Sequence, residues 1–453
     1  MDDDAHGSSK TFLSNSSSQD AEAHYNSGVT LQELGRLEEA AASYSQAITL
    51  KPDFPEAHYN LGNTLQELGR LEETIISLRQ AIALKPDYAE AHINLGLTLH
   101  EMGRVDEAEI SYTQAIACKP DYAEAYNNLG IMLKAQGRLE EAEANYRQAI
   151  ALKPDYAEAY NNLGLMLDAL GRVDEAEASL KQAIAMKPDF AAAFWNLVGC
   201  EKTITGAEYW IDKCLIADSN HEKARLTKVA LKYYQGDSVD FDNLKQSNIK
   251  QHPSMRAFSW AFGLPYLPEL HFNKWCFFDA IVKKSIISKP FYEFGVWKAS
   301  SFKYLIKVFK KGYGFDTFTG LPDDWVFGST IERKGAYSSD GNVPKITGGE
   351  FVVGKFEDTL PVFFSERRPM ASVINFDADL YSSTICALKY SKPVIDKDTV
   401  LIFDEFITNE SWEQDEYKAL SEFCSTNHCS YEVIAISFFT KQVAVKLIGI
   451  EWN

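Results

Sequence analysis

A period of 34 residues runs through the first half of the chain and constrains its fold more than any other feature. Five units repeat one pattern and a looser sixth follows them: Ala21–Phe54, Pro55–Tyr88, Ala89–Tyr122, Ala123–Tyr156, Ala157–Phe190 and Ala191–Ala224. A helix pair of this length cannot bury its own apolar stripe, so copies stack and each covers the next. The sequence therefore predicts an all-α solenoid over residues 21–224.

Small residues and breakers recur at fixed places in each unit. The eighth place, Gly96 in the third unit, lets two helices approach closely, and the fifteenth, Gly103, ends the first helix. A proline such as Pro120 closes the second helix. Val198 stands at the eighth place of the sixth unit, which we interpret as degenerate. This pattern closely resembles the tetratricopeptide repeat.

Asparagine occupies the sixth place in all six units. These residues are Asn26, Asn60, Asn94, Asn128, Asn162 and Asn196. Because this place faces the concave side of such a solenoid, the carboxamides would form a ladder that grips an extended peptide by its backbone. Two alternatives remain, namely inheritance with a duplicated unit and hydrogen bonding to a neighbouring helix. The ladder resembles the one in the O-GlcNAc transferase superhelix, which implies a protein or peptide partner.

Charge and cysteine usage limit the partners and the compartment. The formal net charge of −19 argues against a nucleic-acid partner and against an anionic membrane surface. Seven scattered cysteines favour a reducing compartment, so we expect a cytoplasmic protein. Residues 1–20 are acidic and then serine-rich, which predicts a disordered tail. No stretch approaches the roughly 20 apolar residues of a membrane span.

Residues 225–289 lose the repeat but keep helical patterning and many aromatic residues. We expect a connector whose aromatic side chains form a core between the solenoid and the next domain. The alternative function for this segment is a lid over a following active site.

From Pro290 the pattern changes to short apolar runs that alternate with helical ones, which is typical of an α/β sheet. We expect strands at Phe291–Val296, Gly314–Phe318, Phe351–Lys355, Ala371–Phe376, Thr399–Phe403, Tyr431–Phe439 and Gln442–Ile448. We expect helices at Ser300–Phe309, Ser383–Tyr390 and Gln414–Thr426. Only Thr440 and Lys441 separate the last two strands, so these must form an antiparallel hairpin. The order predicts a Rossmann-like methyltransferase domain, mostly parallel, over residues 290–453.

Acidic residues end several of these strands, at the edge where ligands bind in such sheets. Gly295 allows close backbone approach after the first strand. Asp316 ends the second strand, where it could bind the ribose of a nucleoside or cap a turn. Asp377 and Asp404 follow two later strands, and if these are neighbours their carboxylates repel unless a cation lies between them. Oxygen ligands favour Mg²⁺, and solvated turns are the alternative.

Five ordered motifs carry a second resemblance across about 160 residues. They are Glu293-Phe-Gly-Val-Trp, Asp316-Thr-Phe-Thr-Gly-Leu-Pro, Gly354-Lys-Phe-Glu-Asp-Thr-Leu-Pro, Asp377-Ala-Asp-Leu-Tyr and Phe403-Asp-Glu-Phe. They resemble the macrocin O-methyltransferase family, which uses S-adenosylmethionine and a divalent metal on sugar hydroxyls. The resemblance implies these roles: Glu293, Gly295 and Ser301 beside the methionine part, Asp316 at the ribose, Lys355 and Phe356 at the adenine edge, and Asp377, Asp404 and Glu405 on the metal.

Ala299 and Ser300 depart from the family, which usually has two glycines there. We expect a Mg²⁺-dependent O-methyltransferase that uses S-adenosylmethionine on a sugar or other hydroxyl acceptor, small molecule or glycoconjugate. Asp379 is the nearest unassigned group that could take the proton of the hydroxyl. The alternative function is a protein-interaction scaffold whose methyltransferase-like domain is degenerate and not catalytic.

Overall fold

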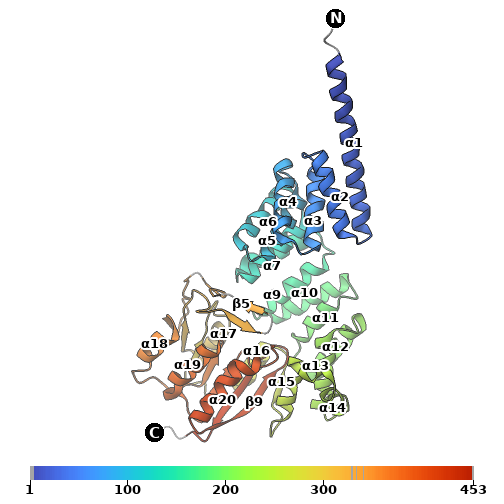
Figure 1. The fold of residues 1–453 in the computed structure, drawn as a ribbon. Helices are drawn as coiled ribbons and strands as arrows, with labels where there is room; N and C mark the ends of the chain where they lie inside the picture. Colours follow the sequence, from blue (N-terminus) through green and yellow to red (C-terminus); the bar gives the residue numbers. More distant parts are fainter. Residues whose placement is uncertain (1–4, 328–329, 333, 340, 451–453) are drawn as a thin grey trace. The chain divides into compact units, whose positions relative to one another are not determined.

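The computed structural model describes residues 5–327, 330–332, 334–339 and 341–450. The chain divides into two compact units, Met1–Ala159 and Tyr160–Asn453 (Figure 1). The division falls inside the fifth repeat, so the fifth repeat from Tyr160 onward and the sixth repeat belong to the same unit as the C-terminal sheet. The predicted boundary at residue 224 therefore does not coincide with the division between the units.

The first unit is a stack of helix pairs, one pair for each repeat. Its helices are α1 (Ala5–Glu33), α2 (Leu37–Leu50), α3 (Pro55–Glu67), α4 (Leu71–Leu84), α5 (Ala89–Glu101), α6 (Val105–Cys118), α7 (Ala123–Ala135) and α8 (Leu139–Leu152). Helix α1 begins at Ala5, inside the segment predicted as a disordered tail. Once the first repeat holds its helix, each added residue contributes one backbone hydrogen bond at no nucleation cost, and this carries the helix into the serine-rich segment.

The glycines of the repeat have the two roles predicted for them. A Cβ built on Gly96 would lie 2.7 Å from Cε1 of Tyr112, so only glycine lets α5 and α6 approach this closely. Gly103 has φ +71° and nothing within 4 Å of a built Cβ, so it is needed for the turn rather than for packing.

The second unit begins with the last repeats and the connector. Its first helices are α9 (Ala157–Ala169), α10 (Val173–Met186), α11 (Ala191–Val198), α12 (Ile204–Ala217), α13 (Glu222–Tyr234), α14 (Val239–Lys245), α15 (Pro253–Phe262) and α16 (Lys274–Lys283). The connector also holds a 3₁₀ turn at Asn248–Gln251 and a short strand, β1 (Glu269–His271), which the periodicity did not predict. Most of its aromatic residues are core rather than lid: Phe258, for example, is 2% exposed and lies edge-on to Phe438, whereas Tyr266 is 79% exposed.

The sheet of the second unit is mixed. Its remaining strands are β2 (Phe291–Phe294), β3 (Gly312–Asp316), β6 (Gly349–Val353), β7 (Val373–Phe376), β8 (Val400–Phe403), β9 (Ser430–Ser437) and β10 (Val443–Ile448). Within the described residues the strand order is β1-β9-β10-β8-β7-β2-β3-β6, and β10 runs antiparallel to both of its neighbours. All seven predicted strands and the terminal hairpin are present. A separate two-stranded sheet joins β4 (Trp325–Phe327) and β5 (Thr330–Glu332).

Helices cover both faces of the sheet. One face packs on α16 and on α17 (Ser300–Phe309), and the other on α15, α18 (Phe356–Phe363), α19 (Tyr381–Ser391) and α20 (Glu416–Thr426). Two further 3₁₀ turns lie at Lys392–Val394 and Trp412–Gln414. The second unit therefore ends in an α/β domain. Throughout the described part of the chain, no helix combines the length and the hydropathy that a membrane span requires.

Candidate functional site

Three neighbouring parallel strands, β2, β7 and β8, bring acidic side chains to one edge of the sheet. Strand β2 pairs with β7, and β7 pairs with β8, as the sequence required for Asp377 and Asp404 to converge. The pairing continues past the strands, because Asp377 N donates to Phe294 O at 2.8 Å and Asp404 N donates to Phe376 O at 3.1 Å. We call the acids gathered here the carboxylate cluster: Glu293, Asp377, Asp379, Asp404, Glu405 and Glu416.

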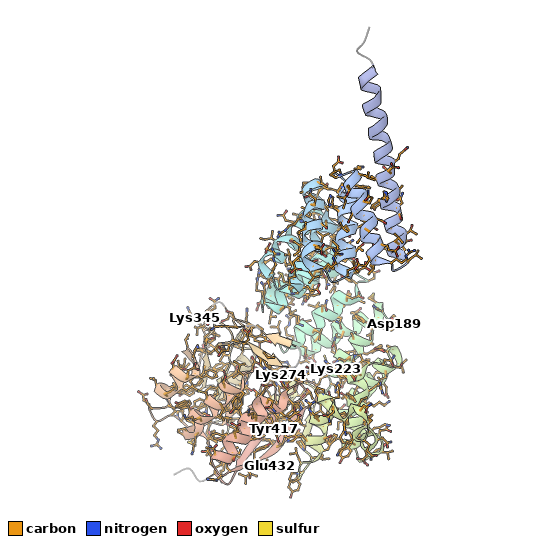
Figure 2. All side chains as sticks on the ribbon, in the orientation of Figure 1. Asp189, Lys223, Lys274, Lys345, Tyr417 and Glu432 are labelled. Atoms are coloured by element: carbon orange, nitrogen blue, oxygen red, sulfur yellow. The ribbon has the colours of Figure 1, made fainter. Side chains whose placement is uncertain are left out.

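Two lysines that the sequence did not single out face this cluster. Lys274, at the start of α16 (Figure 2), places its Nζ 3.1 Å from Asp404 Oδ1. Lys441 Nζ lies 2.7 Å from Glu405 Oε2, and the amide of Gln442 also donates to Asp404. The predicted metal ligands Asp404 and Glu405 are therefore each paired with an ammonium group.

These pairs decide how well the cluster suits a divalent cation. Nowhere in the described ranges are three histidine, cysteine, aspartate or glutamate side chains arranged to hold a metal ion. A cation bound by Asp377, Asp404 and Glu405 would have to displace Lys274 and Lys441. The residues as arranged do not fit the metal, and the Mg²⁺ site stays a prediction of the sequence.

Burial and mutual repulsion shift the pKa values in the cluster. Burial, then the charge of Asp404, raises the pKa of Asp377 to about 8. Burial, then Asp377, holds the pKa of Glu293 and of Asp379 well above the usual range for a carboxyl group. Burial acts to lower the pKa of Lys274, but Asp404 and Asp377 outweigh it, and the net shift is upward. The six carboxyl groups exceed the charge of two lysines, so the cluster favours a further cation or proton.

Some polar atoms beside the cluster are buried without a hydrogen-bond partner. They include Glu293 Oε2, both amide atoms of Asn375, and Glu416 Oε1. Glu293 and Asn375 are register partners on β2 and β7 and are 1% and 0% exposed. Unsatisfied buried groups are rare and costly in folded proteins, so a pair on neighbouring strands marks a place where a polar ligand would be stabilised.

The loop after β2 approaches a neighbouring strand closely. Gly295 has φ +86°, and a Cβ built there would lie 1.7 Å from the carbonyl oxygen of Asp377. The glycine therefore makes room for the backbone at Asp377, and its place beside the methionine part of a cofactor stays a prediction. Ala299, where the family has glycine, adopts the left-handed conformation with φ +61°. The loop keeps the conformation that glycine favours despite the substitution.

The other predicted cofactor residues are placed as follows. Asp316 accepts hydrogen bonds from the backbone N–H of Val296, Trp297 and Phe318 at 2.7, 2.8 and 2.7 Å, so it holds the loop after β2 and forms the turn given as its alternative role. Ser301 is buried in the first turn of α17.

Lys355 and Phe356 lie at the start of α18. The Nζ of Lys355 is 3.7 Å from Glu357. The Phe356 ring lies edge-on to Phe294 in the core, with ring centres 5.6 Å apart. Phe356 therefore contacts the core beneath the sheet edge.

The asparagines at the sixth place brace neighbouring repeats. Asn60 Nδ2 donates to Tyr25 Oη at 3.0 Å, and Asn94 Nδ2 donates to Tyr59 Oη at 3.2 Å. Asn196 Nδ2 repeats the pattern with Asn161 Oδ1 at 2.8 Å. The alternative role, bonding to a neighbouring helix, is therefore present. Asn94 Nδ2 also donates to Asn63 Oδ1 at 2.7 Å, so bracing uses both N–H groups of Asn94 and leaves its oxygen for a peptide.

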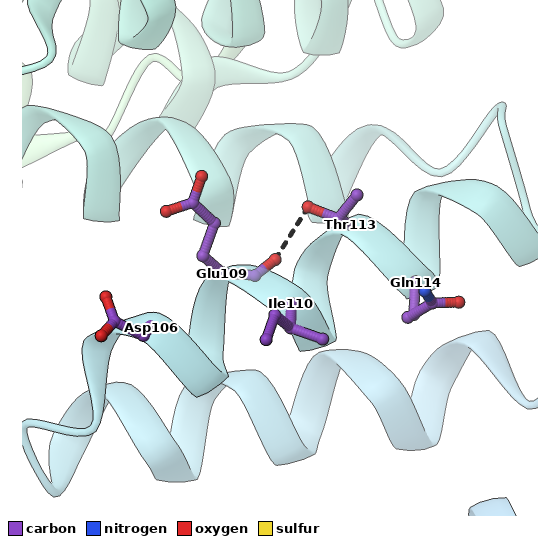
Figure 3. Close-up of a pocket in the computed structure, with 5 residues that line it drawn as sticks. All are labelled: Asp106, Glu109, Ile110, Thr113 and Gln114. Carbon is purple, nitrogen blue, oxygen red and sulfur yellow. Dashed lines mark hydrogen bonds between the residues drawn. The ribbon is translucent and has the colours of Figure 1, made fainter.

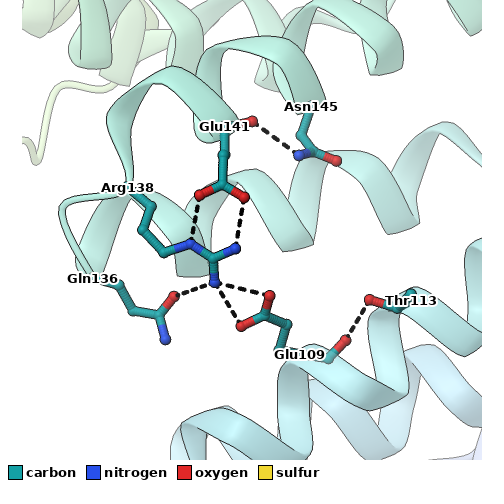
Figure 4. A network of polar contacts seen from close by, with 6 residues as sticks. All are labelled: Glu109, Thr113, Gln136, Arg138, Glu141 and Asn145. Carbon is teal, nitrogen blue, oxygen red and sulfur yellow. Dashed lines mark hydrogen bonds and ion pairs between the residues drawn. The ribbon is translucent and has the colours of Figure 1, made fainter.

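Polar contacts also join the second helices of the third and fourth repeats. The guanidinium of Arg138 lies between Glu109, at 2.7 Å, and Glu141, at 2.6 Å (Figure 4). Glu109 also lines an open hollow of about 400 Å³ on α6, with Asp106, Ile110, Thr113 and Gln114 (Figure 3). This hollow is a surface feature of one helix and lacks the convergent polar groups of a binding site.

Of the two lysines that pair with the carboxylate cluster, Lys441 could have been predicted from the sequence. Because β10 must run antiparallel beside the strand it joins, the residues that precede it reach the carboxyl edge of the sheet, and Lys441 and Gln442 are those residues. Lys274 carries no such signal, because it lies 130 residues from Asp404 in the chain.

These features define a protein built from a tetratricopeptide-repeat solenoid and an α/β domain with a mixed sheet. Models of the TPR repeat match residues 30–69 and 63–103, and models of the tetratricopeptide repeat match residues 89–122, 121–189 and 167–219. The region from residue 30 to residue 219 thus consists of tetratricopeptide repeats. A comparison with curated proteins finds no match.

Three solved structures that are similar to the chain are each matched over most of their own length. A crystal structure of MamA is 28% identical with a TM-score of 0.34, over 36% of this chain and 96% of that one. YrrB, described as a TPR protein with an unusual peptide-binding site, is 24% identical with a TM-score of 0.34, over 41% and 94%. PilF of Pseudomonas aeruginosa is 21% identical with a TM-score of 0.39, over 42% and 90%.

Proposed function

We propose that the protein is an interaction scaffold whose repeats bind an extended segment of a partner polypeptide. The observation that carries this proposal is the recurrence of one exposed or half-buried asparagine on the first helix of every repeat. Tetratricopeptide repeats form extended concave surfaces, and a ladder of carboxamides suits a peptide backbone. The braces between Asn60, Asn94 and Asn196 and their neighbours fix the orientation of the amides before a partner arrives, which lowers the entropic cost of binding.

The test begins with a peptide selected by the full chain from a displayed random library. Its affinity is then measured by fluorescence anisotropy for the wild type and for Asn128→Ala. We expect a loss of about fivefold, the value of one hydrogen bond. Asn145→Ala is the matched control, because Asn145 lies on the second helix α8 and donates to Glu141 O at 2.9 Å. Equal affinities for both variants would remove the asparagine ladder from the proposal.

A second candidate function for the α/β domain is the binding of S-adenosylmethionine, with methyl transfer to a hydroxyl group. It is supported by the strand order and by Glu293 and Asn375, which are buried on neighbouring strands at the carboxyl edge of β2 and β7. Glu293 would bind the amino group of the cofactor, which supplies an electrophilic methyl group. Asp379 would take the proton that the acceptor hydroxyl releases, because it is a carboxyl group of the cluster that has no other role in this proposal. Lys274 and Lys441 already pair with Asp404 and Glu405, so this proposal includes no metal ion.

Thermal melting of the full chain tests this candidate function. S-adenosylmethionine at 100 times its dissociation constant should add about 2.7 kcal/mol to stability. Mg²⁺ should add nothing further, and Glu293→Gln should abolish the shift. A chain that melts unchanged with the cofactor would leave only the scaffold function, and a shift that needs Mg²⁺ would contradict the role given to the lysines. Transfer of a labelled methyl group to hydroxyl acceptors then separates a catalytic domain from one that only binds the cofactor.

A further inference from the structure

The start of α16 is fixed on the fifth and sixth repeats. Asn273 is 1% exposed, and its Nδ2 donates to Gly199 O at 2.8 Å and to Asp168 Oδ1 at 3.2 Å. Its Oδ1 caps the helix by accepting from Trp275 N at 2.9 Å. The indole of Trp275 donates to Asp168 O at 3.0 Å. Lys274, which pairs with Asp404, therefore lies between two residues that are fixed on the repeats.

The turn between β9 and β10 is fixed on the same repeat. The Phe439 ring covers Gly199, where a built Cβ would lie 2.4 Å from Cε1 of the ring. The ring centre of Phe439 is also 5.2 Å from that of Trp195, on the helix that carries Asn196. Lys441, which pairs with Glu405, is two residues further along this turn. Each ammonium group that pairs with the carboxylate cluster thus lies within two residues of a contact with the sixth repeat.

We propose that Asn273 and Phe439 are positioning residues through which the last two repeats hold Lys274 and Lys441 as built-in counter-cations of the carboxylate cluster. The cluster is then complete only with the end of the solenoid in place. Two flexible lysine side chains would not by themselves stay on half-buried carboxylates, since fixing them costs side-chain entropy. Anchoring the backbone on both sides of Lys274 reduces that cost. The proposal depends neither on a bound peptide nor on a bound cofactor.

Binding of Mn²⁺ to the full chain, followed by electron paramagnetic resonance, measures whether the counter-cations are in place. Removing one should open the carboxylates to a metal ion, so Lys274→Met should bind Mn²⁺ at least tenfold more tightly than the wild type. Lys284→Met is the matched control, because Lys284 lies beside α16 but pairs with Glu269 at 2.7 Å. A wild type that binds Mn²⁺ as tightly as Lys274→Met would overturn the counter-cation role.

Asn273→Asp separates positioning from helix capping. Aspartate keeps the oxygen that caps α16 but cannot donate to Gly199 O, and it repels Asp168. We expect Mn²⁺ affinity to rise at least threefold above that of the wild type. If Asn273 only caps the helix, the variant will bind Mn²⁺ as the wild type does, and its positioning role is then lost.

Gly199→Ala tests the contact between Gly199 of the sixth repeat and the Phe439 ring. Gly199 has φ −66°, which alanine adopts freely, so the added methyl group acts by displacing Phe439. Mn²⁺ affinity should again rise at least threefold. Gly130→Ala is the control, since its methyl group would lie 2.8 Å from Tyr146 in the fourth repeat and touch nothing near the cluster. Circular dichroism establishes that both variants fold, and equal Mn²⁺ affinities for the two would refute transmission through Phe439.

Discussion

The eighth and twenty-fourth places of each repeat pack against one another, and rebuilding one pair tests how the solenoid is held together. In the third repeat the pair is Gly96 and Tyr112, and Tyr112 is fully buried. In the sixth unit the same places hold Val198 and Cys214, both fully buried. The large side chain has therefore moved from the second helix to the first. We predict that the third repeat will accept the same exchange when both changes are made together.

The expected energies follow from the contacts. A valine at position 96 forces a branched side chain against a ring already 2.7 Å from a built Cβ, and such overpacking costs about 1–3 kcal/mol. Tyr112→Cys removes a buried aromatic ring and costs about 3–5 kcal/mol. In the double variant Gly96→Val/Tyr112→Cys the valine fills space left by the ring. We expect its cost to be about 1.5–3 kcal/mol below the sum of the single costs.

Gly103→Ala provides the matched control. Its cost of about 1–2 kcal/mol comes from a left-handed backbone, and a built Cβ meets nothing within 4 Å. It should therefore add to Tyr112→Cys within about 0.5 kcal/mol. Hydrogen exchange of the α5 and α6 amides, read by mass spectrometry, gives the local opening free energy of this repeat without requiring the whole chain to unfold in one step. A coupling within about 0.5 kcal/mol of zero for Gly96→Val/Tyr112→Cys would refute the reasoning.

Three further predictions concern the rest of the chain. Burial raises the pKa of Asp415 from 3.8 to about 6, so its ionisation opposes folding as pH rises through this range. The difference corresponds to at most about 3 kcal/mol. After allowance for screening, Asp415→Asn should gain about 1–2 kcal/mol at pH 7 and nothing below about pH 4, as measured by urea unfolding. Gly295→Ala should lower the melting temperature far more than Gly335→Ala. The two glycines have nearly the same φ, +86° and +88°, but only a methyl group at position 295 would collide with backbone, at Asp377. Equal losses of melting temperature would show that the positive φ, and not the collision with Asp377, sets the whole cost of both substitutions. Arg138→Met should lower the melting temperature by about 1–3 °C, and 1 M salt should remove the difference, since the pairs are partly exposed.

The sequence was sufficient wherever local residues set the element. The helices of the repeats end at glycines with positive φ, such as Gly35 and Gly69, and those glycines are visible in the chain. Helix α17 has the predicted bounds, Ser300–Phe309, because an apolar stripe and flanking breakers define it. The strands were found within a few residues for the same reason. Strands β1, β4 and β5 and helix α18 were not predicted. Strand β1 was missed because three residues form a strand only when β9 is already there to pair with them.

The site was predictable in part. The edge at which Asp377 and Asp404 lie could be predicted, because both follow strands of an α/β pattern, but their convergence also required β7 and β8 to be neighbours, which the structure supplies. Whether a metal ion or lysine side chains compensate these carboxylates depends on which residues from other parts of the chain lie at that edge. Lys274 arrives there because Asn273 and Trp275 contact the repeats, and no local pattern encodes a contact across more than 100 residues.

The sixth unit departs from the repeat where it contacts the α/β domain. Its ninth place is Gly199, where the other units have valine, asparagine, leucine or isoleucine, and any larger residue there would meet Phe439. Its first helix, α11, is only 8 residues long. A terminal repeat has no following copy to cover it, so it needs a cap. The last two repeats are contacted, as by a cap, by Phe439, Asn273 and Trp275. The sixth unit departs from the repeat pattern because its surface has to fit these residues. The divergence that made the sixth unit look like a fading repeat is therefore a specific interface with the α/β domain.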